Sequence, residues 1–523
     1  MKKFSARKIL LGFAWLITTV SALGAGAYGH KYRSQIRAMF NSMGPSAAIT
    51  TNLHLLKVEK LVIPAEGRDG GIAVLGDGLL LINRLGKSWY VDGARTLRPL
   101  DLQVPVNTAE FEADPYNKKT ILHELFGVKD IAVQAIPSGI RVFATHSHWN
   151  REQQCNTLRV SMVETTTDKL LAGGAGIGTW RLLFETTPCL ALEKTPEGGQ
   201  RLPLGAGGRL EPLADGAVLL TVGGFDPETE LVKNAPQKPD NSYGKTLRID
   251  PVTGESRIFT LGHRNPQGLA VSRDGRIWMT EHAARGGDEL NLLGESKNYG
   301  YPHVSYGTQY EEMTWPLSNQ QGRHEGFEKP MYVWTPSIGI SQLIVLSKAT
   351  FPTWQGDLIV SSLGGLSLYR VRVEDNRTIF AEPIPIGHRI RDIVEAANGA
   401  IVLKTDDNFL VYLMPLDAAT AATPLERGTV LAATCQACHS MTNDGGARIG
   451  PSLWNIAGRQ VASEGGFEYS AALQAVKGRW TPEMLQRYIA NPSEFAPGTT
   501  MQIGTAYSEA ELADLVAYLQ TLK

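Results

Sequence analysis

A short unit recurs six times between residues 60 and 415, and it constrains the fold of this chain more than any other feature. Each copy is a turn that contains Gly, followed by an extended apolar run. Asp-Gly and Asn-Gly supply the positive φ values of tight hairpin turns, and β-branched or aromatic runs are typical of buried strands. The six copies are GDGLLLIN (76–83), PSGIRVFAT (137–145), ADGAVLLTV (214–222), RDGRIWMTE (273–281), WQGDLIVSS (354–362) and ANGAIVLKT (397–405).

Hairpin units repeated on the scale of a domain predict a repeat architecture. With roughly four strands in each unit, the six units predict an all-β six-bladed β-propeller over residues 55–415. A β-sandwich with long loops is the alternative, and it accounts less well for six matched units. In a propeller the ligand site lies at the mouth of the central channel, so we expect its residues to be scattered along the sequence.

The charge of the chain argues against nucleic acid as a partner. It contains 51 basic and 52 acidic residues, which gives a net charge of −1. Binding to nucleic acid needs a basic face. The 54 Gly and 28 Pro residues favour many short strands and turns over long helices.

The N-terminus has the pattern of an exported protein. Basic residues at positions 2, 3, 7 and 8 precede an apolar stretch from Ile9 to about Ala27. A cleaved signal peptide and a membrane anchor both begin in this way, so residues 1–30 are predicted to be one or the other. The stretch approaches the roughly 20 residues that span a bilayer, which favours a retained anchor. We therefore expect a periplasmic protein, anchored to the inner membrane if the helix is kept. In that compartment Cys155 and Cys189 are equally compatible with a disulfide and with two buried thiols.

Near the C-terminus, Cys435-Gln-Ala-Cys438-His439 forms the C-x-x-C-H pattern of covalent haem c attachment. Both thiols fall on one edge of a helical turn, where they can bond to the haem vinyl groups, and His439 is directed at the iron. A redox pair without haem is the alternative, and the His that follows argues against it. Together with the segments described next, which resemble class I cytochromes c, the pattern implies an all-α haem domain over residues 425–523, joined to the propeller by a linker at 416–424.

The segments that follow the haem pattern resemble class I cytochromes c, in the order of that family. The resemblance implies that Met501 is the second axial ligand of the iron and that the carbonyl of Pro451 orients His439. His/Met ligation raises the potential of the iron, as suits an electron acceptor. The matching segments are ARIGPSLWNIAGRQ (447–460), FEYSAALQ (467–474), TPEMLQRYIANP (481–492) and APGTTMQIG (496–504).

Two helix starts can be predicted in this domain. Thr481 precedes Pro482, which is the pattern of an N-cap followed by Pro at the first helical position. Ser508 and Glu511 have the spacing of a capping box. An apolar stripe at helical spacing follows it, and we expect this last helix to pack on the first helix of the domain.

The long middle part of the chain resembles the glucose/sorbosone dehydrogenase family, the soluble-type aldose sugar dehydrogenases that use pyrroloquinoline quinone (PQQ) on a six-bladed propeller. The match covers most of residues 60–415 in the family's order. Its segments are LGHRNPQGLAVSRDGRIWMTEHAARGGDELNLL (261–293), KNYGYPHVSYG (297–307), WTPSIGIS (334–341), FPTWQGDLIVSSLGG (351–365) and HRIRDIVEAANGAIVLKTDD (388–407).

This resemblance implies roles for two pairs of residues around PQQ. Arg264 and Asn265 match the family's Arg-Asn beside the quinone carbonyls. Arg389 and Arg391 match a pair that binds the PQQ carboxylates, which a guanidinium can hold through two parallel bonds.

The resemblance also implies a calcium ion held against the quinone. Its ligands would be backbone carbonyl oxygens at Ala283 and Ala284, which suit a hard cation. There the ion would polarise a quinone carbonyl for hydride attack.

Two departures from the family affect the expected chemistry. The family's general base is a His in a pattern like H-x-G-G-R-L, and here the matching position is Gly205 in LPLGAGGRLEP (202–212). A Lys that some members carry on PQQ is replaced by Gly364. A positioned base contributes roughly 10²–10⁴ in rate, so its loss matters. His146 and His148 in THSHWN are weak candidates to replace it.

Together these features predict an exported quinohaemoprotein oxidoreductase. It would oxidise a small-molecule sugar or polyol at PQQ and pass electrons through haem c to a respiratory acceptor, a cytochrome or an oxidase. The alternative is an electron-transfer or binding protein in which a degenerate, catalytically weak propeller is fused to a working cytochrome c. The absent His favours the alternative, and the retained arginines favour the dehydrogenase.

Overall fold

The computed structural model describes residues 47–523 except positions 52, 65–67, 118–119, 122, 175, 195–199, 202–204, 225–233, 310–322, 418–419, 444–448 and 504–505. The predicted signal peptide or anchor over residues 1–30 lies outside the described residues. Within the described part of the chain, we find no helix that is long and apolar enough to cross a membrane. The chain divides into two compact units, one that includes residues 60–412 and one formed by residues 45–59 and 413–523.

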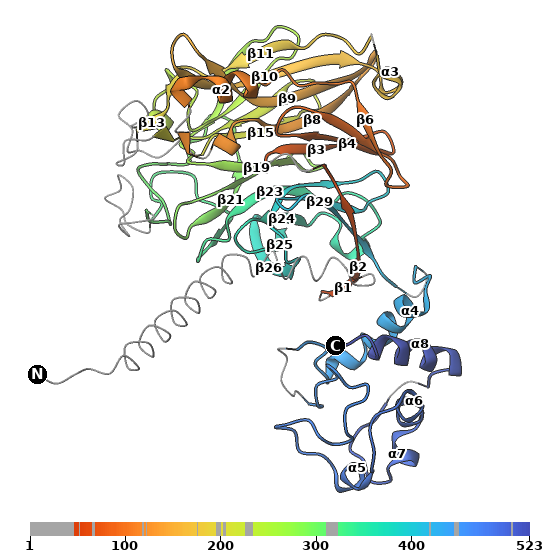
Figure 1. The fold of residues 1–523 in the computed structure, drawn as a ribbon. Coiled ribbons are helices and arrows are strands. Elements are labelled where there is room, and N and C mark those ends of the chain that lie inside the picture. The colour runs from red at the N-terminus through yellow and green to blue at the C-terminus, as the bar shows by residue number, and fades with distance from the viewer. Residues whose placement is uncertain are drawn as a thin grey trace, which may run out of the picture. The chain divides into compact units, whose positions relative to one another are not determined.

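Six antiparallel sheets, numbered here as blades 1 to 6, build the β part of the chain (Figure 1). Blade 1 contains β3 (Gly70–Leu75), β4 (Gly78–Asn83), β5 (Ser88–Val91) and β6 (Leu97–Leu100). Blade 2 contains β8 (Val128–Ile136), β9 (Gly139–Asn150), β10 (Cys155–Thr165) and β11 (Arg181–Glu185), with β12 (Leu190–Ala191) on β10. Blade 3 contains β15 (Gly207–Pro212), β16 (Val218–Val222), β17 (Lys245–Ile249) and β18 (Ser256–Leu261).

The other three blades follow the same order of strands. Blade 4 contains β19 (Pro266–Val271), β20 (Ile277–Glu281), β21 (Asp288–Leu293) and β22 (Tyr332–Trp334). Blade 5 contains β23 (Ile340–Val345), β24 (Leu358–Ser362), β25 (Ser367–Glu374) and β26 (Arg377–Pro385). Blade 6 contains β27 (Ile390–Glu395), β28 (Ile401–Thr405) and β29 (Phe409–Pro415), extended by β2 (Leu55–Val62) and β1 (Ala47–Thr50).

The first strands of the blades form a closed ring. In order around it, the neighbours are β3, β8, β15, β19, β23 and β27, and β27 again neighbours β3. Blade 6 takes β2 from the N-terminal side of the propeller, so the first and last parts of this fold share one sheet. The predicted six-bladed β-propeller is therefore confirmed.

The six repeated sequence units occupy the same place in every blade. Each turn joins the first strand of a blade to the second, and each apolar run forms the second strand. The turns need glycine because its φ lies between +61° and +142° at all six positions, namely Gly76, Gly139, Gly216, Gly275, Gly356 and Gly399. Every residue of β4, β24 and β28 is buried, which explains why these runs are apolar on both faces.

Smaller elements complete the propeller. Three two-residue strands form a separate sheet, and two short helices and a disulfide lie in the loops. These elements are β7 (Thr120–Ile121), β13 (Glu193–Lys194), β14 (Gln200–Arg201), α2 (Thr108–Ala113) and α3 (Thr167–Ala172). Cys155 and Cys189 form a disulfide with a Cα–Cα distance of 5.6 Å. Of the two alternatives that the sequence left open, a disulfide and two buried thiols, the structure therefore contains the disulfide.

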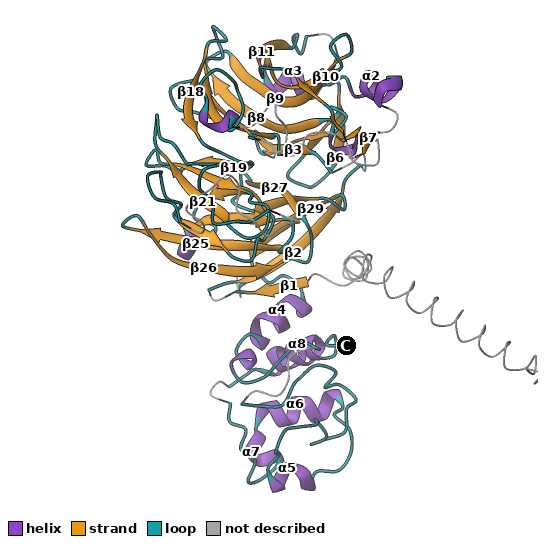
Figure 2. Ribbon diagram, turned by 90° about the vertical axis from the view of Figure 1, so that its left-hand side faces the viewer, coloured by secondary structure: helices purple, strands orange, loops and turns teal. Residues whose placement is uncertain are grey.

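The part of the second unit that begins at Pro424 is helical, as predicted (Figure 2). Thr481 caps α6 with Pro482 at its first position, and Ser508 and Glu511 form the predicted capping box of α8. The stripe Leu512, Leu515, Val516 and Leu519 is buried in the core of this unit. Its helices are α4 (Pro424–Ala432), α5 (Ala471–Ala475), α6 (Pro482–Ala490), α7 (Pro492–Phe495) and α8 (Glu509–Leu519).

The first and last helices of this unit pack closely, as the sequence predicted. A Cβ atom added at Gly428 on α4 would lie 2.0 Å from the carbonyl oxygen of Asp514 on α8, so the crossing needs glycine there. Helix α4 begins at Pro424, the last residue of the predicted linker. Thr423 and Glu426 form a capping box that starts the helix at this point.

One buried guanidinium links the inner strands of the propeller. Arg209 on β15 is 4% exposed. Its Nη1 donates to Asp130 on β8 and to Asp392 on β27, both at 3.1 Å. Its Nε donates to the carbonyl oxygen of Gln267 at 2.7 Å and its Nη2 to that of Arg391 at 2.6 Å. Four of the six inner strands thus meet at this one side chain.

The two carboxylates of this cluster extend it further around the ring. Asp392 Oδ2 accepts from the backbone N–H of Ile72 on β3, and Asp130 Oδ2 accepts from that of Leu210, both at 2.8 Å. Burial raises the pKa of Asp130 to about 7, although the charge of Arg209 opposes this effect and that of Asp392 adds to it. The carboxylates therefore depend on the guanidinium that they share.

We predict that Arg209→Met lowers the free energy of unfolding of the propeller by about 3–5 kcal/mol, because it leaves two buried carboxyl groups without their cation. Arg141→Met is the matched control, since its partner Glu164 is half-exposed and such surface pairs contribute about 1 kcal/mol or less. Chemical unfolding followed by tryptophan fluorescence measures both. Equal losses in the two variants would contradict a special role for Arg209.

Candidate functional site

A cavity of about 290 Å³ lies on the axis of the propeller. Each of the six blades, or the residue that directly precedes it, contributes to its wall. The contributors include Asp69, Lys129, Arg209, Arg264, Ile340 and Arg391. This is the scattered arrangement that the sequence analysis predicted for a propeller site.

β-bulges aim polar side chains into this cavity. In five blades the pairing between the first and second strands shifts register, at Lys129, Gly208–Arg209, Gln267, Ser341–Gln342 and Arg391. An extra residue in one strand redirects its side chain, and bulges of this kind are common beside active sites. Lys129, Arg209, Gln267 and Arg391 all line the cavity. Blade 1 has no such shift. Asp69, the residue that directly precedes its first strand β3, lines the cavity instead.

Arg389 and Arg391, the predicted carboxylate-binding pair, share one acidic partner. Arg391 donates Nε and Nη2 to the two oxygens of Asp406, both at 3.0 Å, and Arg389 donates Nε to Asp406 Oδ2 at 3.0 Å. Burial would lower the pKa of Arg391, but Asp406 and Asp69 outweigh this effect and the pKa is raised. Arg391 lines the cavity, whereas the side chain of Arg389 is 48% exposed.

Arg264 and Asn265, the predicted quinone-binding pair, both line the cavity. Arg264 Nη1 donates to the carbonyl oxygen of His282 at 3.0 Å, and the N–H of His282 donates to the carbonyl oxygen of Asn265 at 2.9 Å. His282 also lines the cavity, and its Nδ1 lies 2.9 Å from Asp288 Oδ1. No pattern in the sequence distinguishes His282 from the other histidines, because its role depends on this tertiary contact.

The segment predicted to bind calcium follows His282. The N–H of Ala283 donates to Asp288 Oδ1 at 2.9 Å, which fixes this turn beside the cavity. Ala283 is buried and Ala284 is partly buried. Among the residues that the structure describes, no group of three or more His, Cys, Asp or Glu side chains could hold a metal ion. A calcium ion here would therefore depend on backbone and cofactor oxygens.

Gly205, which stands where the family has its base, lies in the cavity wall. A Cβ atom at this position would lie 3.5 Å from Asn265 Cγ, an ordinary contact, but the φ of +83° strains any other residue. At Gly364, a Cβ atom would lie 3.0 Å from the carbonyl oxygen of Ile338, so a side chain there is tightly restricted.

The two weak candidates for the base lie outside the cavity wall, so the structure does not support them. His146 is 1% exposed and its ring contacts Ser147 O at 3.1 Å and Ser161 Oγ at 3.0 Å. Burial lowers its pKa to about 4. Burial also lowers the pKa of His148, and the charge of Arg159 adds to the effect.

A second cavity, of about 310 Å³, lies in the helical unit. Cys435, Cys438, His439 and Met501 all line it, as the sequence predicted, and both thiols are free. Most of the remaining wall is apolar and aromatic, with Leu453, Ile456, Trp480, Leu485 and Ile489 among its residues. A largely apolar wall that includes two free thiols fits a covalently bound haem.

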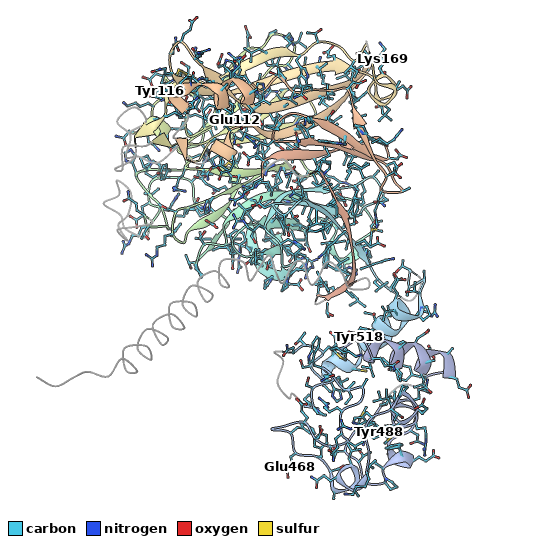
Figure 3. The ribbon with its side chains drawn as sticks, in the orientation of Figure 1. Glu112, Tyr116, Lys169, Glu468, Tyr488 and Tyr518 are labelled. Atoms are coloured by element: carbon cyan, nitrogen blue, oxygen red, sulfur yellow. A yellow bond between two sulfur atoms is a disulfide. The ribbon has the colours of Figure 1, made fainter. Side chains whose placement is uncertain are left out.

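The two predicted axial ligands are held in place by neighbouring groups. His439 Nδ1 lies 2.7 Å from the carbonyl oxygen of Pro451, as expected, so Nε2 is directed away from this contact toward the cavity. A Cβ atom at Gly450 would lie 2.4 Å from the His439 ring, so this loop needs glycine. The N–H of Met501 donates to Thr499 Oγ1 at 3.4 Å, and that hydroxyl lies 2.9 Å from the Tyr488 hydroxyl (Tyr488 is labelled in Figure 3).

Comparison with known proteins agrees with this division of the chain. The family model "Glucose / Sorbosone dehydrogenase" matches residues 72–411, and the model "Cytochrome c" matches residues 425–523. The uncharacterized protein slr1608 of Synechocystis sp. is 32% identical over 303 residues, which are 54% of this chain and 68% of that protein. The aldose sugar dehydrogenase YliI of Escherichia coli is 30% identical over 192 residues, 33% of this chain and 50% of that protein. A cytochrome c homolog of Bradyrhizobium diazoefficiens is 37% identical over 110 residues, 21% of this chain and 59% of that protein.

Solved structures show the same fold for the propeller. A glucose dehydrogenase has a TM-score of 0.54 at 24% identity, and the match covers 68% of this chain and 99% of that one. The apo-form of the soluble aldose sugar dehydrogenase of Escherichia coli has a TM-score of 0.54 at 22% identity, with the same coverage. Since the family model matches well over half of its residues, this chain belongs to the glucose/sorbosone dehydrogenase family, and a cytochrome c domain follows its propeller.

Proposed function

We propose that this protein is a periplasmic quinohaemoprotein dehydrogenase that oxidises a sugar or polyol at PQQ and transfers the electrons to its own haem c. The observation that carries the proposal is that one chain contains two cavities, each lined by residues that fit one of the two cofactors. One is lined by Arg264, Asn265 and Arg391, and the other by the C-x-x-C-H residues and Met501. The periplasmic location rests on the sequence of residues 1–30.

The residues of the propeller cavity fit PQQ, which carries three carboxylates. Arg391 and Arg389, aligned by Asp406, would bind carboxylate groups, because a guanidinium forms charge-assisted bonds with them. Arg264 and the amide of Asn265 would face the quinone carbonyls, with calcium held by the carbonyls of Ala283 and Ala284. When bound, PQQ supplies an acceptor for the hydride of the alcohol carbon.

The residues of the helical unit fit haem c in the same way. Cys435 and Cys438 would bind it covalently, and His439 and Met501 would be its axial ligands. When bound, haem c carries single electrons to a respiratory acceptor, a cytochrome or an oxidase. Because both cofactors belong to one chain, tethering raises the effective concentration of the electron acceptor to about the millimolar range. The name of the Escherichia coli relative supports an aldose sugar as substrate.

We predict that Met501→Ala changes the spectrum of the reduced haem and lowers its potential, because the thioether ligand raises the potential of the iron. Optical redox titration of the purified full chain measures both quantities. Met441→Ala is a suitable control, since Met441 lies in the same core but not in the wall of the cavity. If Met501→Ala leaves spectrum and potential unchanged, Met501 is not a ligand.

We predict that the purified protein binds PQQ in the presence of Ca²⁺, and that Arg264→Ala, Arg389→Ala and Arg391→Ala each weaken binding. Loss of one charge-assisted contact costs about 1.5–3 kcal/mol, which corresponds to at least a tenfold increase in Kd. Equilibrium dialysis gives Kd directly. A wild-type protein that does not bind PQQ would refute the dehydrogenase proposal.

Gly205 favours the second function, an electron-transfer or binding protein with a catalytically weak propeller. Glycine cannot take the hydroxyl proton of the substrate, and neither His146 nor His148 lines the cavity. Both functions include bound haem, whereas the second holds with or without bound PQQ. They differ in the rate of sugar oxidation.

We predict that the unmodified protein oxidises common aldoses slowly and that Gly205→His increases the rate at least tenfold, because a positioned base contributes about 10²–10⁴. The positive φ costs about 1 kcal/mol or more for any side chain, so Gly205→Ala serves as the control for strain without a base. The measurement is the rate of haem reduction after sugar is added to PQQ-loaded protein. Fast oxidation by the unmodified protein would show that the base lies elsewhere, and His282 in the cavity wall would be the first position to change.

A further inference from the structure

Lys129 is a cation in the cavity wall that no sequence motif indicates. It is the bulged residue of β8, and its side chain is 14% exposed. Its Nζ donates to Asp69 Oδ2 at 2.5 Å and to the carbonyl oxygen of Leu125. Its stem packs on the bulge at the start of β15, because a Cβ atom at Gly208 would lie 2.8 Å from Lys129 Cβ. The ammonium group is therefore held inside the cavity instead of extending into solvent.

The wall around Lys129 has more positive than negative charge. Asp69 interacts with Lys129, Arg391 and Lys404, and Asp406 pairs with Arg391 and Arg389. Two carboxylates thus face four cations, and a third, Asp392, also acts on Lys404. Burial lowers the pKa of Lys404 to about 8, and the charge of Arg391 adds to this effect. Asp69 would have a raised pKa from burial alone, but the surrounding cations lower it.

A second set of charged groups adjoins these residues. The buried Arg209 has its own two carboxylates, Asp130 and Asp392, and so adds no net positive charge. Unbalanced charge in a buried wall is unfavourable until a partner of opposite sign binds. The five cations of this region outnumber its four carboxylates, so an anionic ligand such as a carboxylate fits this wall.

We propose that Lys129 is a third cationic residue, beside Arg389 and Arg391, that holds the carboxylates of the quinone cofactor. This inference rests on the proposed function and deepens it by assigning a residue of blade 2 to the cofactor. Asp69 is then a positioning residue, since it contacts Lys129 and fixes where the ammonium group lies. It also opposes the binding of an anion through its own charge.

Substitution of Lys129 and substitution of Asp69 should change the affinity for PQQ in opposite directions. The Kd of PQQ is measured by equilibrium dialysis with Ca²⁺ on the full, haem-containing chain. Lys129→Met should increase Kd at least tenfold, and Lys129→Arg should keep it within a few-fold of the wild type. Asp69→Asn should bind PQQ at least as tightly as the wild type, because the Asn side-chain oxygen still accepts from Lys129 Nζ while the repulsive charge is removed. Lys169→Met, at the exposed end of blade 2 (Lys169 is labelled in Figure 3), should leave Kd unchanged.

The outcomes separate this inference from the proposed function. If the wild type binds PQQ and Lys129→Met binds it equally well, the role of Lys129 is refuted while the dehydrogenase proposal stands. If Lys129→Met and Asp69→Asn both weaken binding, the pair is only a structural ion pair, and the inference is again refuted. If the wild type does not bind PQQ, the proposed function itself fails. Thermal unfolding is recorded for each variant, and Lys129→Gln replaces Lys129→Met if the latter does not fold.

Discussion

The guanidinium of Arg209 joins four of the six inner strands, and the position of the cavity depends on it. Its four hydrogen bonds reach β8, β19 and β27, and Asp392 continues the network to β3. Arginine can do this because its donors diverge in a fixed plane, whereas a lysine offers a single point charge. Arg209 donates to the carbonyl oxygens of the bulged residues Gln267 and Arg391 and to Asp130, which follows the bulged Lys129. The interaction that links the inner strands therefore also positions the wall of the cavity.

Local sequence patterns predicted the parts of the fold that have local causes. The Gly turns and apolar runs marked the second strand of every blade, because hairpin geometry and double-sided burial both leave a signal in adjacent residues. The same holds for the capping box of Ser508 and for the C-x-x-C-H residues. The Cys155–Cys189 disulfide could not be predicted, because 34 residues separate the two cysteines. Lys129 and His282 were missed for a similar reason: a β-bulge and a contact with Asp288 give them their positions, and neither has a sequence pattern.

Two cavities with different chemistry therefore occur in one chain. The propeller cavity has cationic and amide groups and suits a polyanionic quinone, and the helical cavity has thiols, an imidazole and an apolar wall and suits haem. A substrate that loses two electrons needs an acceptor, and haem accepts one electron at a time. In the proposed function, fusion of the two domains would supply that acceptor to every propeller. The proposed chemistry has no assigned group for proton removal, because the resemblance assigns the base position to Gly205, which has no side chain.

The most direct test of this account is the reduction of haem by sugar in PQQ-loaded protein, followed by stopped-flow spectroscopy over a series of protein dilutions. The account predicts that haem is reduced only when PQQ, Ca²⁺ and sugar are all present. It also predicts that the first-order rate stays the same on dilution, because the electrons move within one chain. If bound PQQ is reduced by sugar while the haem stays oxidised, or if the rate falls in proportion to protein concentration, the account is contradicted.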